Sequence, residues 1–154
     1  MKVIDTTLLD AVSAEARENS RLRQNYNFHT DLSDPINRLL NAMQPSTYVP
    51  PHRHINPDKE EICLVLRGSV MNFLFDDNGN VIDRRVIDPS QGTYGFEIEP
   101  GVWHSLVVLE PNTVIYEIKR GPYVPLAVEN IAAWAPKGDD KEAVSSFIDR
   151  LLKE

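Results

Sequence analysis

Two histidines one residue apart, His52 and His54, constrain this chain more than any other feature of its sequence. In a β-strand, side chains alternate between the two faces, so both imidazoles would point the same way and Arg53 the opposite way. Glu61 follows a polar turn at 56–59 and begins an apolar run. A hairpin at this turn could therefore place Glu61 beside the two histidines.

A third histidine, His104, begins another apolar run and could approach the same point from across a barrel. A single histidine beside a strand is usually a hydrogen-bonded core or surface residue, but three histidines and a carboxylate in this order are hard to reach by chance. Imidazole and carboxylate ligands suit divalent Zn, Fe, Mn, Ni or Co. We therefore predict a divalent metal ion bound by His52, His54, Glu61 and His104.

These residues resemble the two motifs of the cupin superfamily. The resemblance lies in His52-x-His54, in Glu61 six residues before Gly68, and in Pro100-Gly101-x-x-His104. The separation of His54 from Glu61 is longer than in the usual cupin pattern, which leaves Glu60 as an alternative ligand. Between about residues 16 and 136, the chain is also similar to the WbuC family of cupin-fold metalloproteins, on the segments 16–21, 27–29, 38–41, 119–123 and 134–136.

The resemblance implies a mainly β fold, a cupin (double-stranded β-helix or jelly-roll) barrel with N-terminal and C-terminal helices. The length of 154 residues fits one structural domain. Within it we expect an N-terminal helical extension at 1–45, the barrel at 46–125, and a C-terminal segment and helix at 126–154. WbuC proteins are found in surface-polysaccharide gene clusters, and their reaction is undefined.

Hydrophobic periodicity predicts the individual elements. One helix is expected at 5–20, and a second is expected to begin at Ser33-Asp34-Pro35, with an apolar stripe at Ile36, Leu39, Leu40 and Met43. A third should follow the cap at 138–140. Turn residues separate seven short strands, which favours a sandwich or barrel. These strands are predicted near 46–50, 61–67, 69–76, 81–87, 94–98, 103–109 and 113–119.

The strand beginning at Glu61 carries apolar residues on both faces. If Glu61, Cys63, Val65 and Arg67 face the interior, then Ile62, Leu64 and Leu66 face outward and need a cover. The terminal helices, a second sheet or another subunit could supply it. We predict a homodimer in which the helices cover part of this face.

Charge and composition limit the classes of partner. The net charge of −7 argues against a nucleic-acid or anionic-membrane surface. The single cysteine, Cys63, allows no disulfide within one chain. No apolar run approaches the length of a membrane span, and residues 1–5 lack the apolar core of a signal peptide. We therefore expect a cytoplasmic protein with a small-molecule ligand.

Several other polar residues are candidates for a binding pocket. Three arginines, Arg17, Arg21 and Arg23, form either a solvated helix face or a clamp for a phosphate or carboxylate. His29, which follows Asn27, belongs either to a surface loop or to a lid over the barrel mouth. The remaining substrate-contact candidates, each with a purely structural alternative, are Tyr48, Arg67 and Trp103.

Glu117 and Lys119 lie two residues apart and therefore share a strand face. If that face is inward, they could act as acid–base groups; if it is outward, they are an ordinary surface pair. Tyr123, in the segment shared with WbuC, is a third catalytic candidate. Trp134-Ala135-Pro136 is expected to anchor the C-terminal segment to the barrel.

Three functions are consistent with these residues. The first is a metal-dependent isomerase, epimerase or lyase acting on a sugar, sugar phosphate or nucleotide sugar, in which the metal acts as a Lewis acid. The choice of a sugar comes from the family resemblance. The second is an Fe(II) cupin dioxygenase, and the third is a non-catalytic sugar-binding or regulatory metalloprotein. One fold hosts many functions, so the fold does not choose between them.

Overall fold

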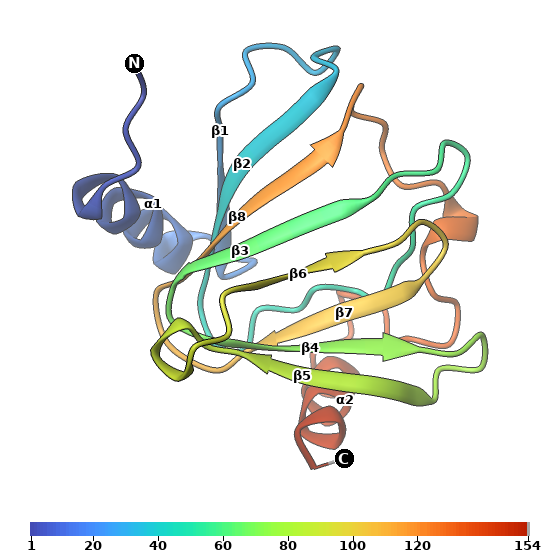
Figure 1. Cartoon of the computed structure of the whole chain (residues 1–154). Helices are drawn as coiled ribbons and strands as arrows, with labels where there is room; N and C mark the ends of the chain where they lie inside the picture. Colours follow the sequence, from blue (N-terminus) through green and yellow to red (C-terminus); the bar gives the residue numbers. More distant parts are fainter. Residues whose placement is uncertain (154) are drawn as a thin grey trace.

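The computed structural model, described here for residues 1–153, consists of two facing antiparallel sheets with one helix on the outside of each. The larger sheet has the order β1-β2-β8-β3-β6 and the smaller one β5-β4-β7. Figure 1 shows α1 beside the larger sheet and α2 below the smaller one. The helices are α1 (Thr6–Glu18) and α2 (Lys141–Lys153), and the strands are β1 (Arg23–Asn27), β2 (Ile36–Met43), β3 (Glu61–Arg67), β4 (Val70–Phe75), β5 (Val81–Ile87), β6 (Gly95–Ile98), β7 (Trp103–Val108) and β8 (Thr113–Arg120).

Most predicted elements are confirmed. Asp5 caps α1 by accepting a hydrogen bond from Leu8 N–H at 2.9 Å, and α2 follows the predicted cap at 138–140. Six of the predicted strands correspond to β3 through β8, with ends that shift by two residues at most. The strand expected at 46–50 is wrong. The chain turns at Ser46 and then forms isolated bridges from His52 to His104 and Ile131.

The helix predicted from Ser33 to Pro45 is also wrong, because this segment forms β2. Asp34 accepts a hydrogen bond from Ile36 N–H at 3.0 Å, which makes a turn into a strand and not a helix cap. The apolar spacing looked helical because β2 is covered on both faces. Leu40 packs under α1 on the outside, whereas Met43 lies in the core between the sheets.

β1 was not predicted at all. Its sequence, Arg-Gln-Asn-Tyr-Asn, has no apolar alternation, because its inward side chains line a polar cavity and not an apolar core. With β1 and β2 both in the larger sheet, residues 1–45 contribute two strands in addition to the N-terminal helix.

Three apolar clusters hold these layers together. One lies between the sheets and contains Met43, Cys63, Val65, Val70, Ile87, Val108 and Ile115. The second joins the outer face of the smaller sheet to α2 through Phe73, Phe75, Val107, Phe147 and Leu151. The third joins α1 to the outer face of β2 and β8 through Leu9, Val12, Ala16, Leu40, Ala42 and Val114. The terminal helices therefore cover parts of the outer faces of β2, β8 and the smaller sheet, but not the face of Ile62, Leu64 and Leu66 that they were predicted to cover in part.

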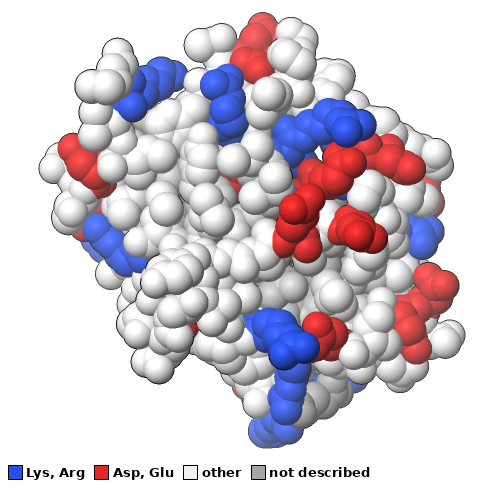
Figure 2. Space-filling view, viewed as in Figure 1, with Lys and Arg blue, Asp and Glu red and all other residues white. Residues whose placement is uncertain are grey.

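The outer face of β3 is the part that the helices leave open. Ile62, Leu64 and Leu66 are 36%, 41% and 39% exposed, whereas Glu61 and Cys63 point inward and are buried. Cross-strand pairing extends this apolar surface onto β8, because Ile62 lies opposite Ile118. In the view of Figure 1, Figure 2 shows a broad area without charged side chains between α1 and this part of the sheet.

Candidate metal centre

The two inward-facing rows on β3 and β8 change from apolar to charged along their length. Val65 pairs with Ile115, Cys63 with Glu117, and Glu61 with Lys119. The core between the sheets therefore gives way to a cavity of about 530 Å³ whose wall carries charged and imidazole side chains. A volume in this range is typical of small-molecule sites.

Four side chains converge in this cavity. His52, His54, Glu61 and His104 each offer one ligand atom, and these atoms all lie within 4.8 Å of one another. His54 Nε2 lies 2.8 Å from the Glu61 Oε2 atom, and His104 Nε2 lies 3.7 Å from it. The four residues come from a loop and two different sheets, so the fold and not local sequence brings them together.

Backbone contacts fix the orientation of two of the imidazoles. His52 and His104 exchange backbone hydrogen bonds at 3.0 and 2.9 Å, which holds their rings side by side with centroids 4.3 Å apart. The Nδ1 atom of His52 lies 2.9 Å from Pro50 O, and that of His104 lies 2.8 Å from Val102 O. We assign each Nδ1 as the donor, which leaves Nε2 unprotonated and free to bind a metal.

The donor set fits a divalent cation. His104 Nε2 is buried and has no hydrogen-bond partner among residues 1–153, which is costly for a polar atom unless something else binds it. Burial, with His104 next to it, lowers the pKa of His52 to about 3, so this imidazole is neutral at physiological pH, as metal binding requires. Glu60 points away and pairs with Arg120 at 3.3 Å, which leaves Glu61 as the carboxylate of the group.

Lys119 connects the histidine cluster to a second carboxylate. Its Nζ atom lies 3.0 Å from Glu61 Oε2 and 2.6 Å from Glu117 Oε1. Burial alone would raise the pKa of Glu61, but Lys119 and the nearby imidazoles of His104 and His54 hold that pKa well below its ordinary value. Burial, together with the charge of Glu61, raises the pKa of Glu117. The site thus contains two carboxyl groups whose pKa values are pushed apart, which suits one to hold a charge and the other to move a proton.

The predicted pocket residues divide into two groups. Arg21, Arg23, His29, Glu117, Lys119 and Tyr123 line the cavity, with Tyr123 at its rim and 53% exposed. Four others, Arg17, Tyr48, Arg67 and Trp103, lie outside it.

Each of these four has a structural partner instead. Arg17 donates to Asn112 Oδ1, and Tyr48 donates to Pro136 O at 2.8 Å. Arg67 was expected to face inward with Glu61, but a bulge between Val65 and Arg67 shifts the register and turns it to Asp10 on α1 at 2.8 Å. Trp103 packs in the core under α2, where Arg53 stacks on its ring.

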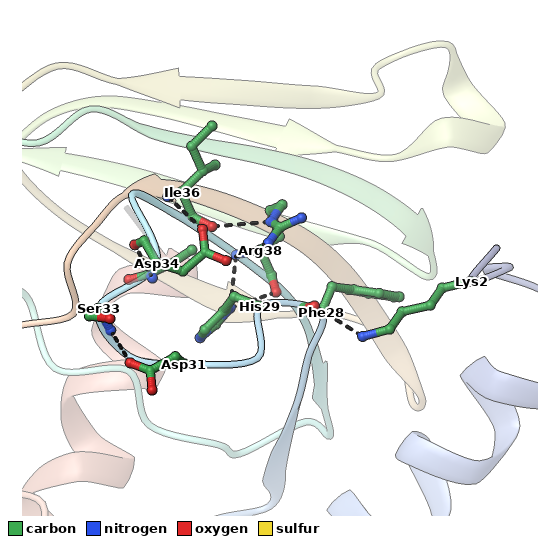
Figure 3. A network of polar contacts seen from close by, with 9 residues as sticks. Lys2, Phe28, His29, Asp31, Ser33, Asp34, Ile36 and Arg38 are labelled. Carbon is green, nitrogen blue, oxygen red and sulfur yellow. Dashed lines mark hydrogen bonds and ion pairs between the residues drawn. The ribbon is translucent and has the colours of Figure 1, made fainter.

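His29 belongs to the loop between β1 and β2, shown in Figure 3. Its Nδ1 atom lies 3.1 Å from Arg38 N and 3.0 Å from Arg38 O. Because Arg38 O already accepts from Phe28 N–H at 2.8 Å, we assign Nδ1 as the acceptor of the Arg38 N–H group. Arg38 is in turn held by Asp34 at 2.9 Å. Nε2–H is then the polar group of His29 that remains for the cavity.

Sequence reasoning missed several polar residues that line the cavity: Asn25, Asn37, Asn41, Lys59, Asn72 and Ser105. Lys59 is buried and donates to Pro122 O. The asparagines on β1 and β2 gave no signal because those strands were not recognised. Residues 23–27 are polar throughout, so they carry no alternation that could have revealed a strand.

Comparisons with known proteins agree with this architecture. The family model described as "Domain of unknown function (DUF6016)" matches residues 4–87, more than half of the chain. The chain belongs to this family. No match was found among curated proteins. The WbuC resemblance is not confirmed by this match.

Solved structures with low sequence identity show the fold. The chain has a TM-score of 0.53 and 16% identity to a cupin 2 domain-containing protein from Halorhodospira halophila, covering 83% of this chain and 81% of that one. For KdgF from Halomonas sp. the TM-score is 0.51 at 16% identity, with 64% and 79% covered. For the capsular polysaccharide assembling protein CapF from Staphylococcus aureus it is 0.53 at 18% identity, with 66% of this chain but only 27% of that one covered. This DUF6016 protein is thus a mainly β, jelly-roll protein with the cupin fold.

Replacing Lys119 by methionine should destabilise the metal-free protein by about 3 kcal/mol at neutral pH, because it leaves two buried carboxylates without their cation. The lowered pKa of Glu61 contributes stability above the pKa of the unfolded chain and loses it as the pH falls. The difference in unfolding free energy between wild type and Lys119→Met should therefore shrink below about pH 4.5.

Urea unfolding at pH 7 and pH 4, in the presence of a chelator, measures the unfolding free energy of wild type and of Lys119→Met. Lys137→Met, at an exposed lysine whose side chain makes no ion pair within residues 1–153, is the control. An equal loss of unfolding free energy at the two pH values would contradict the role given to Lys119.

Proposed function

We propose that this DUF6016 protein is a metal-dependent cupin that acts on a small polar ligand, with His52, His54, Glu61 and His104 holding the metal. The observation that carries the proposal is the convergence of these four groups, with their ligand atoms within 4.8 Å of one another, at the wall of a cavity that polar and apolar side chains line together. When bound, a divalent metal would polarise a carbonyl or hydroxyl oxygen of the ligand. Zn, Fe, Mn, Ni and Co all accept this ligand set.

The neighbouring carboxyl group favours isomerase- or epimerase-type chemistry, in which a proton moves to and from carbon. Glu117 lies next to the metal group on β8 and has a raised pKa, which brings it closer to the pH at which a general base works best. Lys119 holds Glu117 in place at 2.6 Å and neutralises charge beside Glu61. Tyr123, at the rim, would contact the ligand only from the cavity mouth.

We further propose a sugar, sugar phosphate or nucleotide sugar as the ligand, a WbuC-like role in surface-polysaccharide metabolism, and a cytoplasmic location. The chain shares its fold with CapF, a capsular polysaccharide assembling protein, which supports the first two proposals by analogy only. Neither α1 nor α2, the two α-helices within residues 1–153, could span a membrane. We also propose that residues 46–125 form the metal-binding barrel and that 1–45 supply the wall of the cavity.

Metal analysis tests the metal site. Wild-type protein purified without added metal should retain about one divalent ion per chain by mass spectrometry of the metal. His52→Ala and His104→Ala should each lower its affinity at least 100-fold, since each removes a direct ligand.

His29→Gln is the matched control, because it changes a histidine of the same cavity outside the ligand group. Retention of the ion in both alanine variants would contradict the site. Full occupancy by iron would favour the dioxygenase over the isomerase, and zinc or nickel without iron would favour Lewis-acid chemistry.

Solvent exchange tests the proton transfer. An isomerase or epimerase incubated in D₂O with a panel of keto sugars and nucleotide sugars should replace one carbon-bound hydrogen of its substrate by deuterium. Glu117→Gln should slow this exchange by about 10²–10⁴-fold while metal content is unchanged. Proton NMR follows the exchange, and equal rates in wild type and Glu117→Gln would exclude Glu117 as the proton-transfer group.

We propose that the open face of β3 is the interface of a homodimer. Burying Ile62, Leu64 and Leu66 against a second copy would remove from water an apolar face that α1 and α2 leave exposed.

Leu64→Glu should convert the dimer to a monomer, because it places a charge in the centre of that face. Light scattering after size exclusion gives the mass, and Ile82→Glu, at a 63% exposed position on β5, is the control. A wild-type monomer, or a dimer that Leu64→Glu leaves intact, would contradict this interface.

A further inference from the structure

The wall formed by β1 and β2 is rich in carboxamides that the proposed chemistry does not use. Alternation along the two antiparallel strands turns Asn25 of β1 and Asn37 and Asn41 of β2 toward the cavity. Asn25 and Asn41 lie directly opposite each other in the register. The Oδ1 atom of Asn41 is buried and has no hydrogen-bond partner within residues 1–153. A row of amides that both donate and accept hydrogen bonds suits a ligand with several hydroxyl groups.

Two arginines continue this wall. Arg21 and Arg23 line the metal cavity, and they also line an adjoining cavity of about 560 Å³ together with Tyr48, Lys141 and Ser145. Both arginines therefore lie at the boundary between the two cavities. Arg23 is held in place by its Nη1 atom, which donates to Tyr48 O at 2.6 Å. The rest of its guanidinium group makes no hydrogen bond to residues 1–153.

Neither of these two arginines has a carboxylate partner within residues 1–153. Arg53, Arg67 and Arg120 each lie within 4.0 Å of an aspartate or glutamate, whereas no such contact forms at Arg21 or Arg23 in the part of the chain described. Burial and the nearby charge of Arg21 lower the pKa of Arg23, and Glu117 offsets this effect only in part. An anion bound between the exposed Arg21 and the partly buried Arg23 would relieve the repulsion between the two cations.

We propose that the ligand of this cavity is a hydroxylated oxyanion, whose carboxylate or phosphate binds Arg21 and Arg23 while its hydroxyl groups lie along the carboxamides of β1 and β2. Guanidinium groups match the planar carboxylate and the phosphate through paired hydrogen bonds. The inference rests on the proposed function, because it takes the metal centre to bind the other end of the same ligand. The second cavity leaves room for a substituent beyond the anionic group, as in a sugar diphosphate ester.

Calorimetry with matched probes tests this assignment. The panel is glucose, glucuronate, glucose 1-phosphate and UDP-glucose, which share one ring and differ in the anionic group, with inorganic phosphate and pyrophosphate as ring-free anions. Wild-type protein, with its metal content determined, should bind at least one charged sugar about tenfold or more tightly than glucose. A preference for glucuronate would identify a carboxylate ligand, and a preference for either phosphate ester would identify a phosphate ligand.

Variants assign the preference to the arginines. Arg21→Gln and Arg23→Gln should each remove most of the difference in affinity between charged and neutral sugars without changing the metal content. Arg23→Lys should retain part of that difference. Arg84→Gln, at an exposed arginine on β5 outside both cavities, should change nothing. Asn41→Ala should lower the affinity for glucose and for the charged sugars by the same factor, because it removes a contact to the shared ring.

The outcomes separate this inference from the proposed function. A protein that retains metal but binds charged and neutral probes equally, or binds no anion of the panel, overturns the anion site and leaves the metal centre standing. A protein without metal that still prefers anions through Arg21 and Arg23 overturns the proposed function alone. An effect of Arg84→Gln as large as that of Arg23→Gln would also overturn the inference, since it would show a general charge effect.

Discussion

The buried carboxylate of Glu61 is the group on which the rest of the site depends. An isolated charge in this position would be costly, so its neighbours must compensate it. Lys119 does so from β8 at 3.0 Å, and His54 does so from the preceding loop at 2.8 Å. These two contacts fix the positions of the loop that carries His54, of β3 and of β8 relative to one another. A divalent ion would add the remaining positive charge among groups that are already oriented by backbone carbonyls at His52 and His104.

The same charge balance organises the chemistry that the cavity can perform. Lys119 stabilises Glu61 as an anion, whereas burial and the charge of Glu61 raise the pKa of Glu117 although Lys119 opposes that rise. The difference arises from position in the β3–β8 register and not from the residue types, since both are glutamates. The polar end of β3 and β8 therefore places Glu61, a member of the proposed metal group, beside Glu117, the proposed proton-transfer group.

The central strands could be predicted from the sequence because they depend on local patterns, whereas the His52, His54, Glu61 and His104 cluster was recognised from motif spacing although the fold assembles it. Period-two alternation from Glu61 identified both the inward carboxylate and the outward Ile62 and Leu64, and the burial of β3 agrees. β2 could not be predicted in the same way, since its apolar residues serve two cores on opposite faces and imitate a helix. β1 carries polar residues on its inner face because that face lines a cavity. The functional wall of the protein thus has the weakest strand signal.

The position of β1 at the edge of its sheet has a consequence for how such a protein can diversify. β1 pairs with β2 alone, and it contributes none of the four residues of the metal group. Substitutions at its inward positions would disturb neither a second hydrogen-bonded strand nor the four residues of the proposed metal group. The proposed ligand wall and the proposed metal centre are therefore encoded in separate stretches of the chain, so related sequences could change the one while keeping the other.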